Sequence, residues 1–217
     1  MNCYGKESRE MLVRKYEIHP IAHVKLLAGQ EKLSCTGRLL TDSYYCFQYK
    51  KRDDDKKFGT FFCGLPTAKH FLELTDNSEL AQFNPLRSES NSSTTKSNSS
   101  PTLNDNRRPI NPTTKELLDA INLLVVVWNT IPYGRLARIK EAKNKYYYRP
   151  PFKDEISYVN KVISYDKEKR TLAKMLEELS QSNNLKHFDF SLLNKVLDDL
   201  GETSYFGTLK CTSSDLS

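Results

Sequence analysis

The second half of the chain repeats apolar residues at the spacing of amphipathic helices. In residues 117–128 they recur at intervals of three and four, and similar spacing returns in residues 156–163, 172–179 and 192–200. Such a period gives each helix one apolar stripe, which must pack against a neighbour to leave water. The pattern therefore predicts an α-helical bundle from about residue 113 to residue 200.

Residues typical of helix ends stand near several of the predicted boundaries. Thr113 followed by Glu116 has the form of a capping box, and Asp166 is placed to cap a later helix. Pro132 ends the first of these helices, and Gly201 stands where a residue in the left-handed conformation often terminates a helix. These signals agree with the apolar period and support the helical interpretation.

The N-terminal part has a different pattern, in which aromatic residues alternate with other side chains. Residues 44–50 and 58–63 each predict a strand with two unlike faces, and the odd-numbered aromatic residues of the first share one face. The charged run 51–57 between them suits only a hairpin loop. Residues 67–75 predict a short helix, whereas residues 23–33 are compatible with either a helix or a strand.

Residues 88–106, between the two patterns, consist almost entirely of Ser, Thr and Asn. This composition cannot bury enough apolar surface to offset the entropy of ordering the chain, so it predicts a disordered, flexible linker. The expected fold class is α+β. Its parts are a small α+β domain with an aromatic β-hairpin at 1–85, the linker at 86–112, a helical domain at 113–206 and a frayed tail at 207–217.

Composition excludes several classes of protein. The chain of 217 residues is 28% charged, with a mean hydropathy of −0.63. No apolar run approaches the roughly 20 residues that a membrane-spanning helix needs, and the first residues lack the apolar core of a secretory signal. The five cysteines have irregular spacings, so we expect reduced thiols rather than a disulfide scaffold. These features indicate a cytoplasmic or nuclear protein without membrane association.

One stretch, residues 134–153, carries most of the unbalanced charge. It holds seven cations and one carboxylate, a surplus equal to the net charge of +6 of the whole chain. Tyrosines are interleaved with these cations, and that combination can neutralise phosphates and stack unpaired bases. The segment predicts contact with nucleic acid, through its backbone or as a single strand, by Arg135, Arg138, Lys140, Lys143, Lys145, Tyr147 and Arg149. The alternative is a solvated basic helix face.

Cysteine and histidine indicate a second class of function. Cys63 stands just before a predicted helix start, with His70 seven residues further on, and this arrangement can lower the pKa of a thiol and supply a base. His19 and His23 are another candidate acid–base pair. Either pair would make the chain a small enzyme or toxin-like effector acting on RNA or nucleotides, although no GxGxxG, GxxxxGK[ST], HExxH or GxSxG motif occurs.

The same cysteines raise the question of zinc. Cys35, Cys46, Cys63 and His70 are ligands of the kind that zinc prefers, but no CxxC pair brings two sulfurs onto one turn. The simpler interpretation is that Cys46 and Cys63 fill the core of the hairpin, because free cysteines are commonly buried. The sequence therefore assigns no metal and no cofactor.

The function expected from these patterns is that of a non-enzymatic binding or adaptor protein. Its basic helical domain would contact nucleic acid within a larger assembly, so the expected partners are nucleic acid and another protein. In a pure protein–protein adaptor, the aromatic hairpin would be the docking surface instead. The sequence alone leaves open whether the chain is an enzyme.

Overall fold

A computed structural model describes residues 1–87, 108–129 and 132–207 of the chain. Its main sheet has the strand order β5-β4-β1-β6, in which β1, β4 and β5 are antiparallel and the short β6 pairs in parallel with β1. The strands of this sheet and of a separate hairpin are β1 (Tyr16–Lys25), β2 (Lys32–Leu33), β3 (Leu39–Leu40), β4 (Ser43–Lys51), β5 (Asp54–Cys63) and β6 (Gln82–Phe83). Most of the predicted linker and tail lies outside the described residues.

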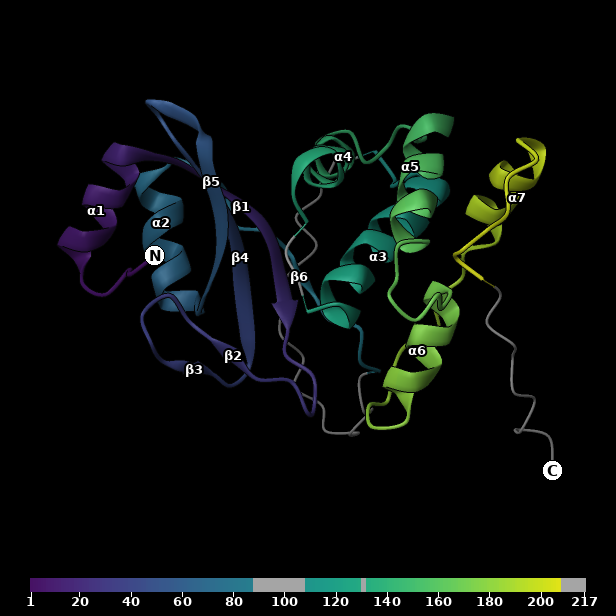
Figure 1. Cartoon of the computed structure of the whole chain (residues 1–217), viewed down its shortest axis with the longest axis horizontal. Coiled ribbons are helices and arrows are strands. Elements are labelled where there is room, and N and C mark those ends of the chain that lie inside the picture. The colour runs from purple at the N-terminus through teal and green to yellow at the C-terminus, as the bar shows by residue number, and fades with distance from the viewer. Residues whose placement is uncertain (88–107, 130–131, 208–217) are drawn as a thin grey trace, which may run out of the picture.

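Helices flank the sheet on both faces (Figure 1). They are α1 (Lys6–Lys15), α2 (Leu65–Leu74), α3 (Pro112–Val127), α4 (Gly134–Lys145), α5 (Lys153–Ile163), α6 (Leu172–Ser180) and α7 (Ser191–Asp199). The predicted α+β class, with strands in the first half and helices mostly in the second, is confirmed. In the part of the chain that the structure describes, no helix has the length and apolar character needed to cross a lipid bilayer.

The aromatic alternation of the hairpin produces two buried faces of the sheet. Tyr45 and Phe47 belong to an apolar cluster that includes α1 and α2, on one side of the sheet in Figure 1. Tyr44 and Cys46 point the other way and pack in a second cluster with Val125 of α3 and with α4. The predicted alternation is confirmed, and the second half of the chain covers one of its faces.

The hairpin strands are longer than the sequence predicts. They extend into the charged run 51–57, so that Arg52 and Asp53 alone form the turn. The reason is that β5 is an edge strand, whose charged side chains can remain in water while its backbone pairs with β4. Helix α1 is also absent from the predictions, because it contributes no fully buried residue and therefore has only a weak apolar period.

Two predicted helix caps are wrong, and one predicted helix end is confirmed. Asn111, rather than Thr113, caps α3, because its side-chain oxygen accepts a hydrogen bond from the backbone of Thr114 at 3.1 Å. Glu116 instead accepts hydrogen bonds at 3.1 Å from two backbone N–H groups in the first turn of α7. Gly201 follows α7 with a φ of 69°, the left-handed conformation expected after a helix.

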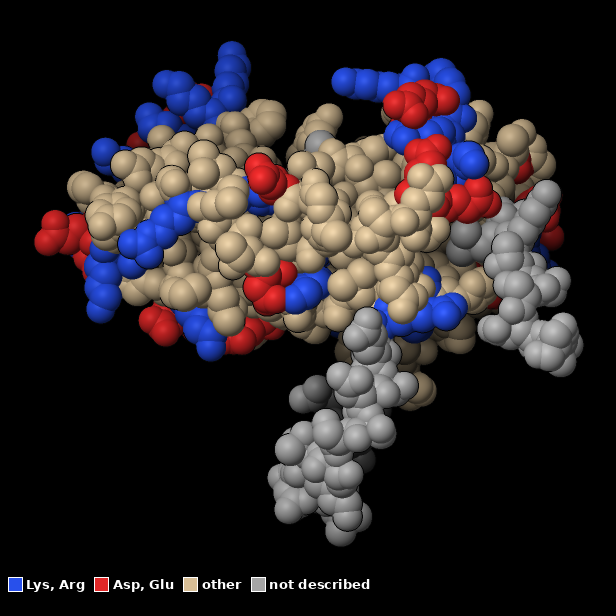
Figure 2. Space-filling view, turned by 90° about the horizontal axis from the view of Figure 1, so that it is seen from below, with Lys and Arg blue, Asp and Glu red and all other residues tan. Residues whose placement is uncertain are grey.

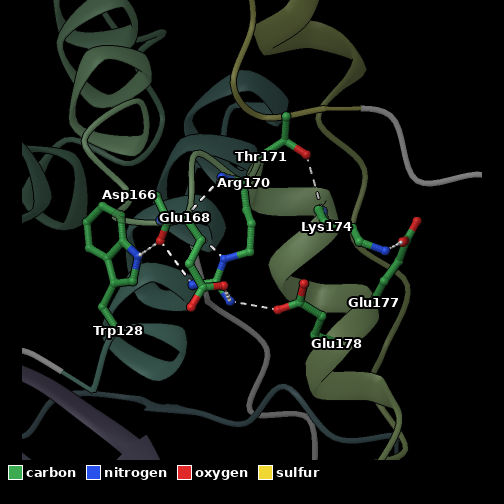
Figure 3. A network of polar contacts seen from close by, with 8 residues as sticks. All are labelled: Trp128, Asp166, Glu168, Arg170, Thr171, Lys174, Glu177 and Glu178. Atoms are coloured by element: carbon green, nitrogen blue, oxygen red, sulfur yellow. Dashed lines mark hydrogen bonds and ion pairs between the residues drawn. The ribbon is translucent and has the colours of Figure 1, made fainter.

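Asp166 also has a different role from the predicted cap. Thr171 caps α6, whereas Asp166 is buried in the network of Figure 3. It accepts hydrogen bonds from the Trp128 indole at 3.0 Å and from two nitrogens of the Arg170 guanidinium at 3.1 Å. Arg170 also donates to Glu178 at 2.6 Å. Because its partners fill the carboxylate's acceptor positions, we assign this network to the stability of the α3–α6 contact.

Candidate functional site

The structure divides the seven residues of the predicted nucleic-acid segment between buried, paired and exposed positions. Lys140 and Lys143 are only 5% and 4% exposed. The Lys143 ammonium lies 2.7 Å from a carboxylate oxygen of Glu155, and the Arg135 guanidinium lies 2.6 Å from one of Asp154. These cations are therefore buried or already neutralised, and they do not form one continuous basic surface.

The remaining cations of the segment are exposed. Arg138, Lys145 and Arg149 have no carboxylate partner among the described residues. Lys145 and Arg149 lie 5.4 and 5.2 Å from the centroid of the Tyr146 ring. Tyr147 is half-buried, and its carbonyl accepts a hydrogen bond from the chain just before α3. Nucleic-acid contact thus stays a prediction, which these exposed residues would have to carry.

Charge outside this segment is mixed in sign. On the face drawn in Figure 2, Lys and Arg side chains are interspersed with Asp and Glu over both halves of the molecule. The sequence-wide balance of charge therefore does not show where cations gather locally.

Two lysines are buried where the sheet meets the helices. Lys32 and Lys140 are 3% and 5% exposed, and burial lowers the pKa of each to about 8. The Lys32 ammonium lies 3.9 Å from the centroid of the Phe62 ring and 4.6 Å from that of Tyr44. Lys140 has no hydrogen-bond acceptor in the described part of the chain. Neither lysine lines a surface cavity of the described residues that is large enough to be considered a site, so we assign this pair no ligand.

Three surface cavities differ in how their charges are compensated. One of about 490 Å³, between β6 and α3, contains Lys115 paired with Asp119 at 3.1 Å, and its Glu116 is engaged by α7. Another of about 810 Å³ lies along α5 and contains the Arg135–Asp154 pair. Both cavities are therefore lined by charges of both signs, which reduces the net attraction for a charged ligand.

The third cavity, of about 410 Å³, is cationic. It is formed by the starts of α1 and α2 and by the turn between β2 and β3. Lys6, Arg9 and Arg38 line it, and among the described residues no carboxylate lines it or pairs with any of these cations. The caps of the two helices, Gly5 and Gly64, provide no side-chain hydrogen bond. The first turn of α2 contains no acidic residue, so the partial positive charge of this helix end adds to the cavity, whereas Glu7 offsets that of α1.

Arg9 is held in place by groups around the cavity. Its Nε donates to Nδ1 of His70 at 2.8 Å, and its Nη1 donates to the carbonyl of Cys3 at 3.1 Å. The first bond requires the His70 proton to reside on Nε2. His70 is thus bonded to Arg9 rather than to Cys63, so the predicted thiol–imidazole pair is not formed in this structure.

Three free thiols lie next to the same cavity, and residues adjacent to each of them line it. The amide of Cys3 donates to the carbonyl of Cys35 at 3.1 Å, and the amide of Cys35 donates to the carbonyl of Phe62 at 2.7 Å. Hydrogen bonds from Cys3 and Cys63 lower the pKa of Cys35, whereas the same bonds and burial raise the pKa of the other two thiols. Cys35 is also the half-exposed member.

The set of zinc ligands considered from the sequence is not brought together. Cys46 packs on the face of the sheet toward α3, whereas Cys63 packs on the face toward α2, with Cys35 against the same cluster. Within residues 1–87, 108–129 and 132–207, no group of three or more His, Cys, Asp or Glu side chains is arranged to hold a metal ion.

The second candidate acid–base pair is also separated. A β-bulge after Pro20 shifts the register of β1, so that His19 lies beside Gln48 and His23 beside Tyr45. Their partners are on opposite faces of β4, and so are the two histidines. The His23 ring stacks on Tyr45 at a centroid distance of 4.2 Å, and burial lowers the pKa of this histidine.

The aromatic hairpin, the alternative docking surface, is largely occupied by the protein's own core. Tyr44, Tyr45 and Phe47 are fully buried, whereas Phe58 near the turn is 60% exposed. A protein partner would therefore find one exposed ring on this hairpin rather than an aromatic face. The docking role stays a prediction.

The fold and the cavity together define an α+β protein whose N-terminal layer holds a cationic cavity beside a cluster of thiols. The chain belongs to the family described as "Uncharacterised conserved protein UCP028583", whose model matches residues 1–205. The match therefore runs through both the sheet and the helices. Among curated proteins and among solved structures, no match to the chain was found.

Proposed function

We propose that the chain is a ligand-binding protein whose N-terminal cavity takes a small molecule bearing a phosphate group. The observation that carries this proposal is the lining of the cavity, where Lys6, Arg9 and Arg38 converge without a carboxylate among the described residues. Its volume of about 410 Å³ suits a small ligand. The hydroxyl group of Thr67 in the same lining is a further donor for phosphate oxygens.

The three cations would contribute in different ways. The bonds of Arg9 to His70 and to the Cys3 carbonyl fix its guanidinium, so binding would cost little side-chain entropy. Lys6 and Arg38 are exposed and would close on the ligand from the two sides of the cavity. The N-terminus of α2, whose first turn contains no acidic residue, favours an anion at the same place.

The proposal is tested by titrating inorganic phosphate into ¹⁵N-labelled protein and following backbone amide shifts. We expect the shifts to concentrate in the first turns of α1 and α2 and in the β2–β3 turn. Lys6→Gln and Arg38→Gln should each weaken binding about tenfold, because each removes a charge-assisted contact worth about 1.4 kcal/mol.

Arg14→Gln is the matched control, because Arg14 lies on the same helix but in its last turn. It should leave phosphate affinity within about twofold, since its charge is remote from the cavity. Equal weakening by Arg14→Gln, or shifts confined to other parts of the protein, would refute the cavity as the binding site.

A second candidate function is the predicted contact with nucleic acid. It is supported by the exposure of Arg138, Lys145 and Arg149, the last two of which lie beside the Tyr146 ring. The test is fluorescence anisotropy of a mixed-sequence single-stranded oligonucleotide over a range of salt concentrations. Lys145→Glu with Arg149→Glu should reduce the slope of log K against log salt by about 1.4, at about 0.7 per lost contact.

The matched control for this second test reverses two exposed lysines elsewhere in the helical half, Lys161→Glu with Lys195→Glu. An equal loss of affinity in this control would reduce the interaction to general attraction by net charge. Binding that is insensitive to salt would equally count against the proposed contact.

A further inference from the structure

We propose that Cys35 and Cys3 form a redox-active pair, in which Cys35 reacts with a small hydroperoxide and Cys3 then closes a disulfide with it. This inference goes beyond phosphate binding and does not require it. It is based on the position of three free thiols beside an open cavity, with backbone hydrogen bonds joining the segments that carry them.

Cys35 is the member of the cluster that a small reagent can reach. It is half-exposed, whereas Cys3 and Cys63 are fully buried, and its two chain neighbours line the cavity. Its thiolate is stabilised by hydrogen bonds from both other thiols, which lower the pKa of Cys35. The thiolate is the reactive form of cysteine, so the geometry and the charge state favour attack by the same sulfur.

Of the two buried thiols, Cys3 is better placed than Cys63 to form the disulfide with Cys35. Its amide donates directly to the Cys35 carbonyl, which holds the two main chains side by side. The residues before α1 belong to no helix or strand, so they can shift as the sulfurs approach to bonding distance. Cys63, in contrast, is fixed at the end of β5 by its pairing with Tyr45 of β4.

The reaction balances with the peroxide as the oxidant. The Cys35 thiolate attacks one peroxide oxygen, the O–O bond breaks, and the leaving alkoxide takes a proton from water to give an alcohol. The Cys3 sulfur then attacks the Cys35 sulfenic acid, the S–O bond breaks, and the hydroxide leaves as water with the Cys3 proton. Two thiols lose two electrons in total, and the peroxide gains them.

The experiment uses the full chain with Cys211→Ser, because Cys211 lies outside the described residues. The reduced protein is treated with an equimolar amount of hydrogen peroxide, and its disulfides are mapped by mass spectrometry without reduction. We expect a Cys3–Cys35 disulfide that dithiothreitol reverses. Cys46 is the internal control, because burial raises its pKa to about 12 on the opposite face of the sheet.

Alkylation by iodoacetamide gives an independent measure of the reactive thiol. The rate at Cys35 should be nearly constant between pH 6 and pH 8, whereas an unperturbed cysteine in a reference peptide gains about tenfold per pH unit. A Cys35 rate that rises with pH like that of the peptide would contradict the proposal.

Two variants separate the roles of the buried thiols. Cys3→Ser should stop the reaction at the sulfenic acid, which dimedone traps on Cys35, whereas Cys63→Ser should still form the Cys3–Cys35 disulfide. A Cys35–Cys63 disulfide in the parent, or zinc that co-purifies with the thiols and protects them, would overturn the pairing. Lys6→Gln distinguishes the two proposals, because it should weaken phosphate binding without preventing the disulfide.

Discussion

Replacing Lys140 by methionine should stabilise the protein. Lys140 is 5% exposed and has no hydrogen-bond acceptor within the described part of the chain. Burial lowers its pKa to about 8 from the ordinary lysine value of 10.5. A difference of about 2.5 pKa units corresponds to about 3 kcal/mol of destabilisation when both states are protonated. Methionine keeps an unbranched chain of similar volume, so we expect a gain of about 1–3 kcal/mol at pH 7.

The pH dependence of this gain follows from the direction of the pKa change. Below pH 8 the lysine is protonated in both states, and its destabilisation is fully present. Between pH 8 and pH 10.5 the unfolded chain binds a proton that the folded chain has lost, so the parent gains stability as pH rises. Above pH 10.5 the cost has disappeared, and the advantage of Lys140→Met should have disappeared with it.

Urea unfolding of parent and variant between pH 7 and pH 10.5 measures the difference. Lys32, Tyr44 and Cys46, which also titrate around this junction, are present in both proteins, so their contributions largely cancel. Lys145→Met, on the exposed side of the same helix, is the control and should change stability by less than about 0.5 kcal/mol. A destabilised Lys140→Met, or a gain that does not fall above pH 8, would refute the reasoning.

Three further substitutions test other parts of the structure. Asp166→Asn should cost about 2–3 kcal/mol in urea unfolding, because it replaces the charged, buried acceptor of the Trp128 and Arg170 hydrogen bonds, although Glu178 still pairs with Arg170. Hydrogen bonds from Arg170 hold the pKa of Asp166 well below its usual range, so the loss of stability in Asp166→Asn should shrink as the pH falls below about 4. The control, Glu168→Gln at an exposed position, should change stability by less than about 0.5 kcal/mol at every pH. Glu116→Ala should cost about 1 kcal/mol and speed amide exchange in the first turn of α7, and unchanged exchange there would contradict its capping role. Gly201→Ala should cost about 1 kcal/mol, because alanine disfavours a φ of 69°, and a neutral result in thermal unfolding would show that the chain relaxes there.

The parts of the fold that the sequence predicts correctly are those with a strong local period. The alternating aromatic residues of β4 and the apolar stripes of the helices determine which side chains are buried, whatever the tertiary context. The errors concern partners that are remote in sequence. Glu116 caps a helix that begins about 75 residues later, and β6 is too short to leave a pattern of its own.

The number of cations in residues 134–153 does not measure the basic surface, because some of these side chains are buried, and the sequence itself contains the pattern that indicates this. Lys140 and Lys143 continue the stripe of Leu136 and Ile139 at helical spacing, so they fall on the buried side of α4. Because both side chains are buried, they do not contribute to a basic surface. A helical projection of residues 134–145 would have separated these lysines from the side of the helix that faces solvent.

The cationic cavity could not be found in this way. Lys6 and Arg9 are interspersed with carboxylates along α1, so their local charge is balanced, and Arg38 lies in a distant turn. Their convergence depends on α1 packing beside α2 and on the β2–β3 turn reaching the same place. The same applies to Cys3 and Cys35, whose contact is set by backbone hydrogen bonds between segments without a sequence period.

The division into two domains stays a prediction, but the packing argues that the halves depend on each other. Val24, Tyr44 and Cys46 are buried against Val125 of α3, so an isolated N-terminal unit would expose this face of its sheet to water. Lys32 from the sheet side and Lys140 from α4 both act on the buried Cys46 at this contact. Burying these two charges therefore opposes the packing of the two halves against each other. The free energy gained by removing apolar surface from water at this contact must exceed that penalty.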